Sequence, residues 1–148
     1  MAEKTIDIAS PILSRNERLA DQLRQRFKET NTFVINVLSS PGSGKTTTIL
    51  GTNERLRDKA DLRCAVIEGD IASDVDAITM KEAGMPAIQI NTGGLCHLEG
   101  NMIMEAVDAF DQAVGLENID VIFIENVGNL VCPVDFDLGE NLSIMIPV

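Results

Sequence analysis

The sequence has no tryptophan and no tyrosine, and aromatic residues make up only 3% of its 148 residues. A hydrophobic core must therefore be built mainly from aliphatic side chains and methionine, because hydrophobic residues still make up 45% of the chain. No apolar run approaches the roughly 20 residues that a membrane-spanning helix needs. The N-terminal stretch MAEKTIDIAS is charged and has no apolar segment, so we expect no signal peptide.

Basic residues are also scarce: 12 lysines and arginines face 23 aspartates and glutamates, which gives a formal net charge of −11. Nucleic acids and anionic membrane surfaces attract basic proteins, so we expect neither as a partner. The three cysteines are an odd number in a chain without an export signal, which favours reduced thiols and a cytoplasmic location. The length predicts about one domain.

The strongest signal lies in residues 33–48, FVINVLSSPGSGKTTT, where an apolar run leads through a glycine-rich turn into a segment that can be helical. This order is typical of a phosphate-binding loop. The glycines let backbone N–H groups turn toward one anion, and the opening helix directs its positive dipole end there. Lys45 can bridge the outer phosphates and Thr46 can ligate Mg²⁺. The predicted nucleotide-binding residues of this loop are Pro41, Gly42, Ser43, Gly44, Lys45, Thr46 and Thr47.

The loop departs once from the pattern G-x-x-x-x-G-K-[ST], because Ser39 stands where the first glycine belongs. Serine is small and favours turns, so we expect the variant to be tolerated. The alternative is an ordinary strand-to-helix turn with a surface lysine. The agreement of strand, motif and helix favours the phosphate loop.

Apolar runs of strand length alternate with helical segments along the chain. We expect helices over residues 11–28, 45–59, 73–83 and 99–114. We expect strands over residues 33–38, 62–68, 87–91 and 119–124, and a further apolar run over residues 142–148. Strands that are apolar throughout indicate a parallel sheet covered on both faces. The fold class is therefore α/β, a three-layer P-loop NTPase fold with a mostly parallel sheet, whose ligands lie at the carboxyl ends of the strands.

The first predicted helix is amphipathic, and Ile12, Leu19, Leu23 and Phe27 fall near one face. We therefore divide the chain into residues 1–30, an N-terminal extension with a helix packed on the domain, and residues 31–148, the P-loop domain.

Two acids follow predicted strands at the edge where ligands should lie. Asp70, in EGD, can reach Mg²⁺ or report on the phosphate, or it is simply an acid at the start of the next helix. Glu125 directly follows the strand over 119–124, and Gly128 comes three residues later. Glu125 can hold the water of the metal or orient the attacking water, and the Gly128 N–H can meet the γ-phosphate. A plain turn is the alternative. The candidate catalytic residues are thus Lys45, Asp70 and Glu125, and the candidate Mg²⁺ ligands are Thr46, Asp70 and Glu125.

Cys96, His97 and Cys132 form a candidate metal site, because thiols and imidazoles are ligands of soft or borderline metals. The alternative is that they are scattered core or turn residues. Three ligands leave a zinc or nickel site incomplete, so water or a second chain must complete it. A two-fold dimer that places these loops face to face would do so. Cys64 falls within a predicted strand and is expected to be a buried, inert thiol.

Five motifs together resemble the HypB family, the nickel-incorporation GTPases of [NiFe]-hydrogenase maturation. They are SSPGSGKTTT at 39–48, EGDI at 68–71, DVDA at 74–77, QINTGGLCHLEG at 89–100 and IENVGNLVCPVDFDLGE at 124–140. The resemblance runs from about residue 10 to residue 140, and the last two motifs are the most specific to the family.

This resemblance implies a homodimerising GTPase that binds GTP with Mg²⁺ and hydrolyses it slowly. It implies that Ni²⁺ passes to the hydrogenase large-subunit precursor together with a HypA-type nickel chaperone. It also implies a metal site made by Cys96, His97 and Cys132, with nickel in function and zinc in some preparations. The guanine-reading motif Asn-Lys-x-Asp is absent from these residues, and the chain ends inside an expected strand, so we expect the fold to be incomplete at the C-terminus.

Two other functions remain open at this point. A urease-type nickel GTPase belongs to the same class, but it carries a Cys-Pro-His motif, whereas this chain has Cys-His-Leu and Val-Cys-Pro. A non-enzymatic metal-binding fragment would keep the thiol site without base recognition.

Overall fold

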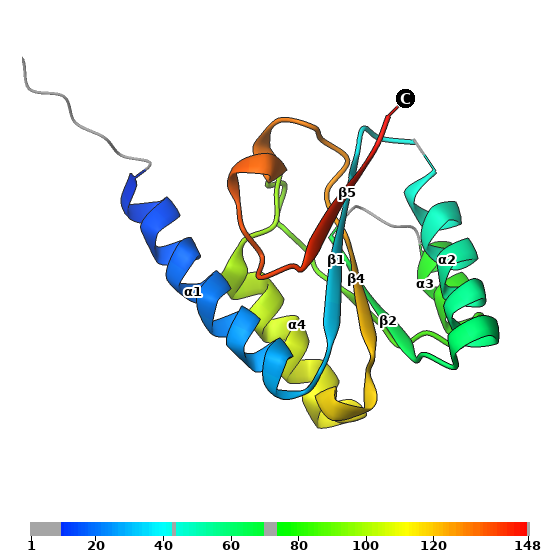
Figure 1. Cartoon of the computed structure of the whole chain (residues 1–148). Coiled ribbons are helices and arrows are strands. Elements are labelled where there is room, and N and C mark those ends of the chain that lie inside the picture. Colours follow the sequence, from blue (N-terminus) through cyan, green and yellow to red (C-terminus); the bar gives the residue numbers. More distant parts are fainter. Residues whose placement is uncertain (1–9, 43, 70–73, 148) are drawn as a thin grey trace, which may run out of the picture.

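The computed structural model describes residues 10–42, 44–69 and 74–147, in which helices and strands alternate (Figure 1). The α-helices are α1 (Ser10–Glu29), α2 (Lys45–Ala60), α3 (Asp74–Glu82) and α4 (Gly100–Ala113). The strands are β1 (Phe33–Ser39), β2 (Cys64–Glu68), β3 (Ala87–Gln89), β4 (Val121–Glu125) and β5 (Leu142–Ile146). Two short 3₁₀ helices are η1 (Leu116–Asn118) and η2 (Cys132–Asp135). None of the helices in the described residues is long and apolar enough to cross a bilayer.

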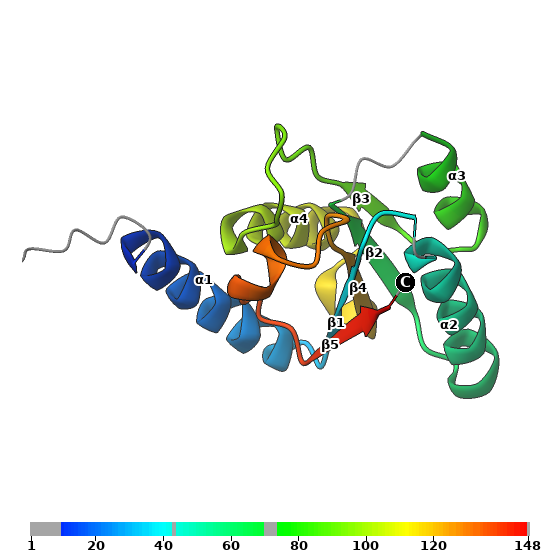
Figure 2. The ribbon, with the colours of Figure 1, turned by 90° about the horizontal axis from the view of Figure 1, so that it is seen from above.

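The strands form one sheet in the order β3-β2-β4-β1-β5, and every neighbouring pair is parallel. Helices α1 and α4 cover one face and helices α2 and α3 cover the other (Figures 1 and 2). The expected three-layer α/β fold with a parallel sheet is therefore confirmed. Because all strands run the same way, the loops after β1, β2, β3 and β4 open on one edge of the sheet.

The core is divided between the two faces of the sheet, since successive side chains of a strand point to opposite sides. On the α1 and α4 side, Val34 of β1 joins a cluster with Phe27 and Phe110. On the other side, Ile35 and Val37 of β1 join a cluster that includes Ile49 of α2 and Met80 of α3. Strands buried on both faces explain why their sequences are continuously apolar.

The expected apolar face of the first helix is only partly correct. Leu23 and Phe27 are buried, but Ile12 is 52% exposed. Ala20, one turn before Leu23, and Asn16, two turns before it, occupy the other buried positions. The first turns of α1 reach past the sheet, so an apolar residue there meets no core (Figure 2). Helical periodicity indicates which face is apolar, but it does not indicate how far the partner surface extends.

The other element boundaries differ from the expected ones by at most two residues, mostly because turns and caps replace strand or helix ends. Glu125 is the last residue of β4 rather than the first residue of the loop, and it is buried. Cys64 opens β2 rather than lying mid-strand and is buried as expected. Val114, expected on the apolar stripe of the fourth helix, is 42% exposed because the helix has already ended at Ala113. Within the run expected over 142–148, the structure has the edge strand β5 (Leu142–Ile146), with exposed side chains such as Met145.

Candidate functional site

The glycine-rich turn after β1 has the backbone of a phosphate-binding loop. Gly42 and Gly44 have φ values of 73° and 86°, a left-handed region that disfavours side chains with a Cβ. Helix α2 begins at Lys45, and the Thr48 N–H donates to the Gly44 carbonyl over 3.0 Å. Thr47 is exposed beside this turn. Ser43, predicted to bind nucleotide, lies outside the described residues.

Ser39 has a definite role in this loop although it departs from the expected glycine. The Lys45 ammonium donates to the Ser39 hydroxyl over 3.0 Å, and that hydroxyl donates to the Ser40 carbonyl over 2.9 Å. Both Ser39 and Lys45 are buried. The lysine therefore lies inside the loop. The alternative of an ordinary turn required it to lie on the surface, so the observed burial disfavours that alternative. A phosphate can replace the neutral hydroxyl as acceptor, because charge-assisted hydrogen bonds are the stronger ones.

Thr46 and Glu125 meet although 79 residues separate them: the Thr46 hydroxyl donates to Glu125 Oε1 over 3.0 Å. A hydroxyl and a carboxylate are the hard oxygen donors that Mg²⁺ prefers, so the residues at this place fit the expected cation. Glu68 is the register neighbour of Glu125 on β2 and is 1% exposed, so a second buried carboxylate ends the adjacent strand. Asp70, the other predicted ligand and catalytic candidate, lies outside the described residues.

Gly128 lies directly against the phosphate loop. A Cβ at this glycine would stand 3.1 Å from both the Cα and the Cγ of Pro41. Asn126, which is buried, fixes the start of the loop that carries Gly128. Its amide donates to Asn36 Oδ1 over 3.1 Å, and its Oδ1 accepts the Val127 N–H over 2.8 Å. The structure thus brings together the loop after β1 and the loop after β4, as nucleotide binding between them would require.

Cys96 and Cys132 lie near enough for their thiols to interact. A hydrogen bond with Cys132 is the largest of the effects that raise the pKa of the Cys96 thiol, and partial burial and the charge of Cys132 act in the same direction. The two thiols come from the loop after β3 and from the start of η2, which are brought together only by the fold. Because a thiol must lose its proton to bind a metal, metal binding at this pair would release protons.

His97 is packed beside this thiol pair. Its ring stacks on Phe136 with centroids 4.0 Å apart, its Nδ1 lies 3.6 Å from the Cys96 sulfur, and its Nε2 lies 3.0 Å from Glu99 Oε1. A carboxylate on one ring nitrogen leaves the other nitrogen to face a metal. All three predicted metal ligands therefore lie together.

These side chains do not yet form a closed metal cage. Among the residues that the structure describes, no group of three or more His, Cys, Asp or Glu side chains is arranged to hold a metal ion. Two thiols and an adjacent imidazole suit nickel or zinc in donor type. If these side chains bind a metal, one chain supplies only part of the site, a half-site, and a ring rotation, a water or a second chain must complete it.

The thiol loop also packs on the turn after β2. Leu98 is fully buried, and a Cβ at Gly69 would stand only 2.5–2.7 Å from the Leu98 side chain. Gly69 follows Glu68, so the loop that carries Cys96 and His97 rests on the strand end next to the nucleotide loops.

Several residues of this region were not identified from the sequence: Asn16, Asn36, Glu68, Glu99, Asn126 and Phe136. For Asn36 the signal was present, since it is a single polar residue within a continuously apolar strand. Glu68 likewise ends an apolar strand, as Glu125 does. Asn16 gave no signal, because its partners lie 84 and 121 residues away in the chain.

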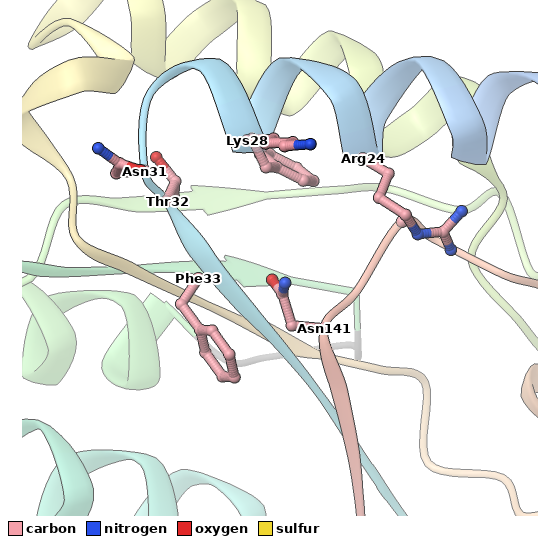
Figure 3. Close-up of a pocket in the computed structure, with 8 residues that line it drawn as sticks. Arg24, Lys28, Asn31, Thr32, Phe33 and Asn141 are labelled. Carbon is pink, nitrogen blue, oxygen red and sulfur yellow. The ribbon is translucent and has the colours of Figure 1, made fainter.

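A separate cavity of about 340 Å³ lies at the opposite edge of the sheet, beside Phe33 at the start of β1 and Asn141 before β5 (Figure 3). Lys28 and Arg24 of α1 also line it. It opens at the amino ends of the strands and is therefore not part of the site described above.

Comparison with known proteins places these features in a family. Residues 33–142 match the CobW/HypB/UreG nucleotide-binding domain. The hydrogenase/urease maturation factor HypB of Helicobacter hepaticus is 43% identical over 144 residues, which are 97% of this chain and 58% of that protein. The hydrogenase maturation factor HypB of Escherichia coli is 44% identical over 143 residues, 97% of this chain and 47% of that protein. This chain thus spans about half the length of these relatives.

Two solved structures are similar to the fold. HypB from Helicobacter pylori in complex with nickel superposes with a TM-score of 0.78 and 41% identity, covering 88% of this chain and 59% of that one. The hydrogenase maturation factor HypB from Archaeoglobus fulgidus gives a TM-score of 0.80 and 38% identity, covering 90% and 62%. The resemblance to HypB is confirmed, and the chain belongs to the CobW/HypB/UreG nucleotide-binding domain family.

Proposed function

We propose that this chain is part of a GTP-dependent nickel metallochaperone, in which GTP binding and hydrolysis gate the release of Ni²⁺ into the [NiFe]-hydrogenase large-subunit precursor. The observation that carries the proposal is that one segment of the chain links the phosphate loop to the Cys132 thiol. It begins at Glu125, which contacts Thr46 of the phosphate loop, passes Gly128 on Pro41, and reaches the Cys132 thiol. A nucleotide that moves this segment moves a metal ligand with it.

The nucleotide side of the site has distinct roles for its residues. Lys45 binds the outer phosphates in exchange for Ser39, and Gly128 offers its N–H to the γ-phosphate. Thr46, Asp70 and Glu125 hold Mg²⁺, which neutralises phosphate charge when bound. Glu125 also orients the attacking water, and Lys45, Asp70 and Glu125 act in catalysis. Pro41, Gly42, Ser43, Gly44 and Thr47 complete the phosphate cradle.

The cargo side consists of Cys96, His97 and Cys132, and their soft donors suit Ni²⁺ or Zn²⁺. Nickel is favoured because the similar Helicobacter pylori HypB structure is a complex with nickel. A HypA-type nickel chaperone is the expected donor or co-carrier. The three cysteines are unpaired, in keeping with a cytoplasmic protein.

A homodimer formed through the metal-site loops would complete the half-site. Four apolar side chains surround the thiols in sequence and are exposed: Leu95 at 43%, Leu130 at 36%, Val131 at 76% and Val134 at 58%. We call these four residues the apolar collar. Exposed apolar side chains grouped around an incomplete site favour a protein interface there.

The two sites can be separated by two substitutions. Lys45→Ala should abolish Mg²⁺-GTP binding and leave Ni²⁺ binding nearly intact, and Cys96→Ala should do the reverse. Both are measured by isothermal titration of GTP and of Ni²⁺, with and without the other ligand. Because coupling is reciprocal, GTP must change Ni²⁺ affinity by the same factor by which Ni²⁺ changes GTP affinity. Equal affinities with and without the second ligand would exclude gating.

A urease-type role is the second candidate. The Helicobacter hepaticus relative is named a hydrogenase/urease maturation factor, so one HypB can serve both enzymes. Supplementing hydrogenase and urease activation assays separately with this protein distinguishes the two. A chain that binds Ni²⁺ or Zn²⁺ but no Mg²⁺-GTP would instead be a non-enzymatic metal-binding fragment.

A further inference from the structure

We propose that Asn16 of α1 is a positioning residue that fixes the separation of the two segments carrying Cys96 and Cys132. The inference rests on the proposed function, because it takes these thiols as the metal ligands. It goes beyond that function in assigning the geometry of the thiol pair to the N-terminal helix, which contributes none of the predicted ligands.

The Asn16 side chain joins both segments at once. Its Oδ1 accepts the Gly100 N–H over 2.6 Å, and its Nδ2 donates to the Asp137 carbonyl over 2.7 Å. Gly100 opens α4 immediately after the loop of Cys96, and Asp137 lies two residues after the end of η2, which begins at Cys132. One amide group therefore spans the two thiol-bearing segments, at a position that is 5% exposed.

This bridge supplies a hydrogen bond that α4 does not supply for itself. Within the described chain, Glu99 stands at the N-cap of α4 but makes no side-chain capping bond, and its carboxylate faces His97 instead. Helix N-termini need acceptors for their first N–H groups. Asn16 provides one from another helix, which releases Glu99 to orient the imidazole.

An amide is the side-chain group that suits this place, because it presents an acceptor and a donor side by side. A buried alanine here would leave both the Gly100 N–H and the Asp137 carbonyl without this partner. An aspartate would retain the acceptor for Gly100, favourably placed at a helix N-terminus, and would lose the donor.

Close packing on α1 supports the same arrangement. A Cβ at Gly100 would stand 3.0 Å from Leu19 Cβ, and a Cβ at Gly139 would stand 2.9 Å from Leu23 Cβ. Each segment thus has a glycine where it lies on the helix. Arg24 adds an ion pair at 2.7 Å to the Asp137 carboxylate, beside the loop that leads into β5 (Figure 3).

The main test compares Ni²⁺ affinity in Asn16→Ala, Asn16→Asp and Asn53→Ala. Asn53 is a matched control, since it is 4% exposed on α2 and donates to the Ala83 carbonyl over 3.3 Å, away from both thiols. Residues that hydrogen-bond metal ligands directly change affinity about 10–100-fold, and Asn16 acts one step further out, so Asn16→Ala should raise the Ni²⁺ Kd by about tenfold, the lower end of that range. Asn16→Asp should give an intermediate Kd and Asn53→Ala less than about twofold change, with GTP affinity equal in all variants.

A second measurement needs no metal. Diamide, an azo oxidant, converts two neighbouring thiols to a disulfide: the S–S bond forms, and two electrons and two protons pass to the N=N group. The rate of Cys96–Cys132 disulfide formation, followed by peptide mapping, should fall in Asn16→Ala and stay unchanged in Asn53→Ala. Circular dichroism checks that each variant is folded.

The two proposals fail in different ways. If the wild-type chain binds no Ni²⁺, the proposed function is wrong, while the oxidation rates still test the role of Asn16. If folded Asn16→Ala and Asn53→Ala have the same Ni²⁺ affinity and the same oxidation rate, Asn16 stabilises the fold without positioning the thiols, and this inference is overturned.

Discussion

At the scale of single residues, Gly128 is where the two nucleotide loops meet. Its Cβ position lies 3.1 Å from backbone and side-chain atoms of Pro41, which is tighter than ordinary van der Waals contact. A side chain at position 128 is excluded by steric contact and not by backbone conformation, because Gly128 is not among the glycines with positive φ. A side chain there must push the loops apart.

We therefore expect Gly128→Val to raise the GTP Kd about tenfold, since overpacking costs about 1–3 kcal/mol and here acts on the loop spacing. Gly51→Ala is the control. Gly51 is exposed on α2, and apart from its chain neighbours and the nearby backbone of the helix, no atom of the described residues lies within 4 Å of its Cβ position. Because glycine disfavours helix interiors, this change should stabilise the chain by about 1 kcal/mol and leave GTP affinity unchanged. Unaltered GTP binding by Gly128→Val would show that the contact does not set the loop spacing.

At the scale of elements, the segment between β4 and β5 is fixed at both ends but touches different partners along its length. It begins on the phosphate loop through Gly128, carries Cys132, and is held to α1 through Asp137. Burial acts to raise the pKa of Asp137, but hydrogen bonds from Arg24 and from the Gly139 N–H outweigh it and leave the pKa below its usual value. The ionised carboxyl therefore stabilises the attachment of this segment.

The sign of the pH dependence follows from this lowered pKa. A carboxyl with a lowered folded pKa stabilises the protein above its unfolded pKa of about 3.9, and this contribution disappears as the pH falls through the folded value. Asp137→Asn should lower the free energy of unfolding by about 0.5–1 kcal/mol at pH 7, because the pair is partly exposed. The difference from wild type should shrink as the pH falls below about 3.9 and disappear below the lowered pKa of the folded protein, as measured by urea unfolding at several pH values.

Asp21→Asn is the control for this pair. Asp21 also contacts Arg24 at 2.8 Å, but its side chain is 79% exposed and lies on the same helix. Its replacement should change stability by only a few tenths of a kcal/mol. A stability difference for Asp137→Asn that stays constant from pH 7 to pH 3 would contradict the ionic contribution.

At the scale of the whole molecule, charge and apolar surface are distributed unequally. The net charge of −11 disfavours association of like molecules in general, so contact between two copies needs a specific apolar surface. We propose the apolar collar as this surface, because its four side chains are exposed and belong to the segments after β3 and β4, at the carboxyl edge of the sheet. Dimerisation, nucleotide binding and metal binding are therefore expected to depend on one another.

Val131→Asp should prevent GTP- and Ni²⁺-dependent dimerisation, because it places a charge in the most exposed residue of the apolar collar, at 76%. Sedimentation velocity with both ligands measures the change. Ile78→Asp is the control. Ile78 is 55% exposed on α3, which covers a face of the sheet and is not part of the loops that carry the apolar collar. The collar would not be the interface if both variants dimerised as the wild type does.

The sequence by itself determined the features that depend on local periodicity and local backbone chemistry. Strands buried on both faces must be apolar throughout, so the alternation of runs predicted a parallel sheet, and parallel strands bring their following loops to one edge. The phosphate loop was identifiable for the same reason, since Gly42 and Gly44 need backbone conformations that short-range sequence reveals.

Only the tertiary structure decided which of these loops touch and what holds them in place. The contacts of Gly128 with Pro41 and of Asn16 with Gly100, and the interaction of the Cys96 and Cys132 thiols, join segments far apart in the chain. The same packing left Ile12 exposed and buried Asn16 on a helix whose periodicity favoured the reverse. Such contacts depend on where the surface of one layer ends against another, and a one-dimensional pattern of residues does not contain that distance.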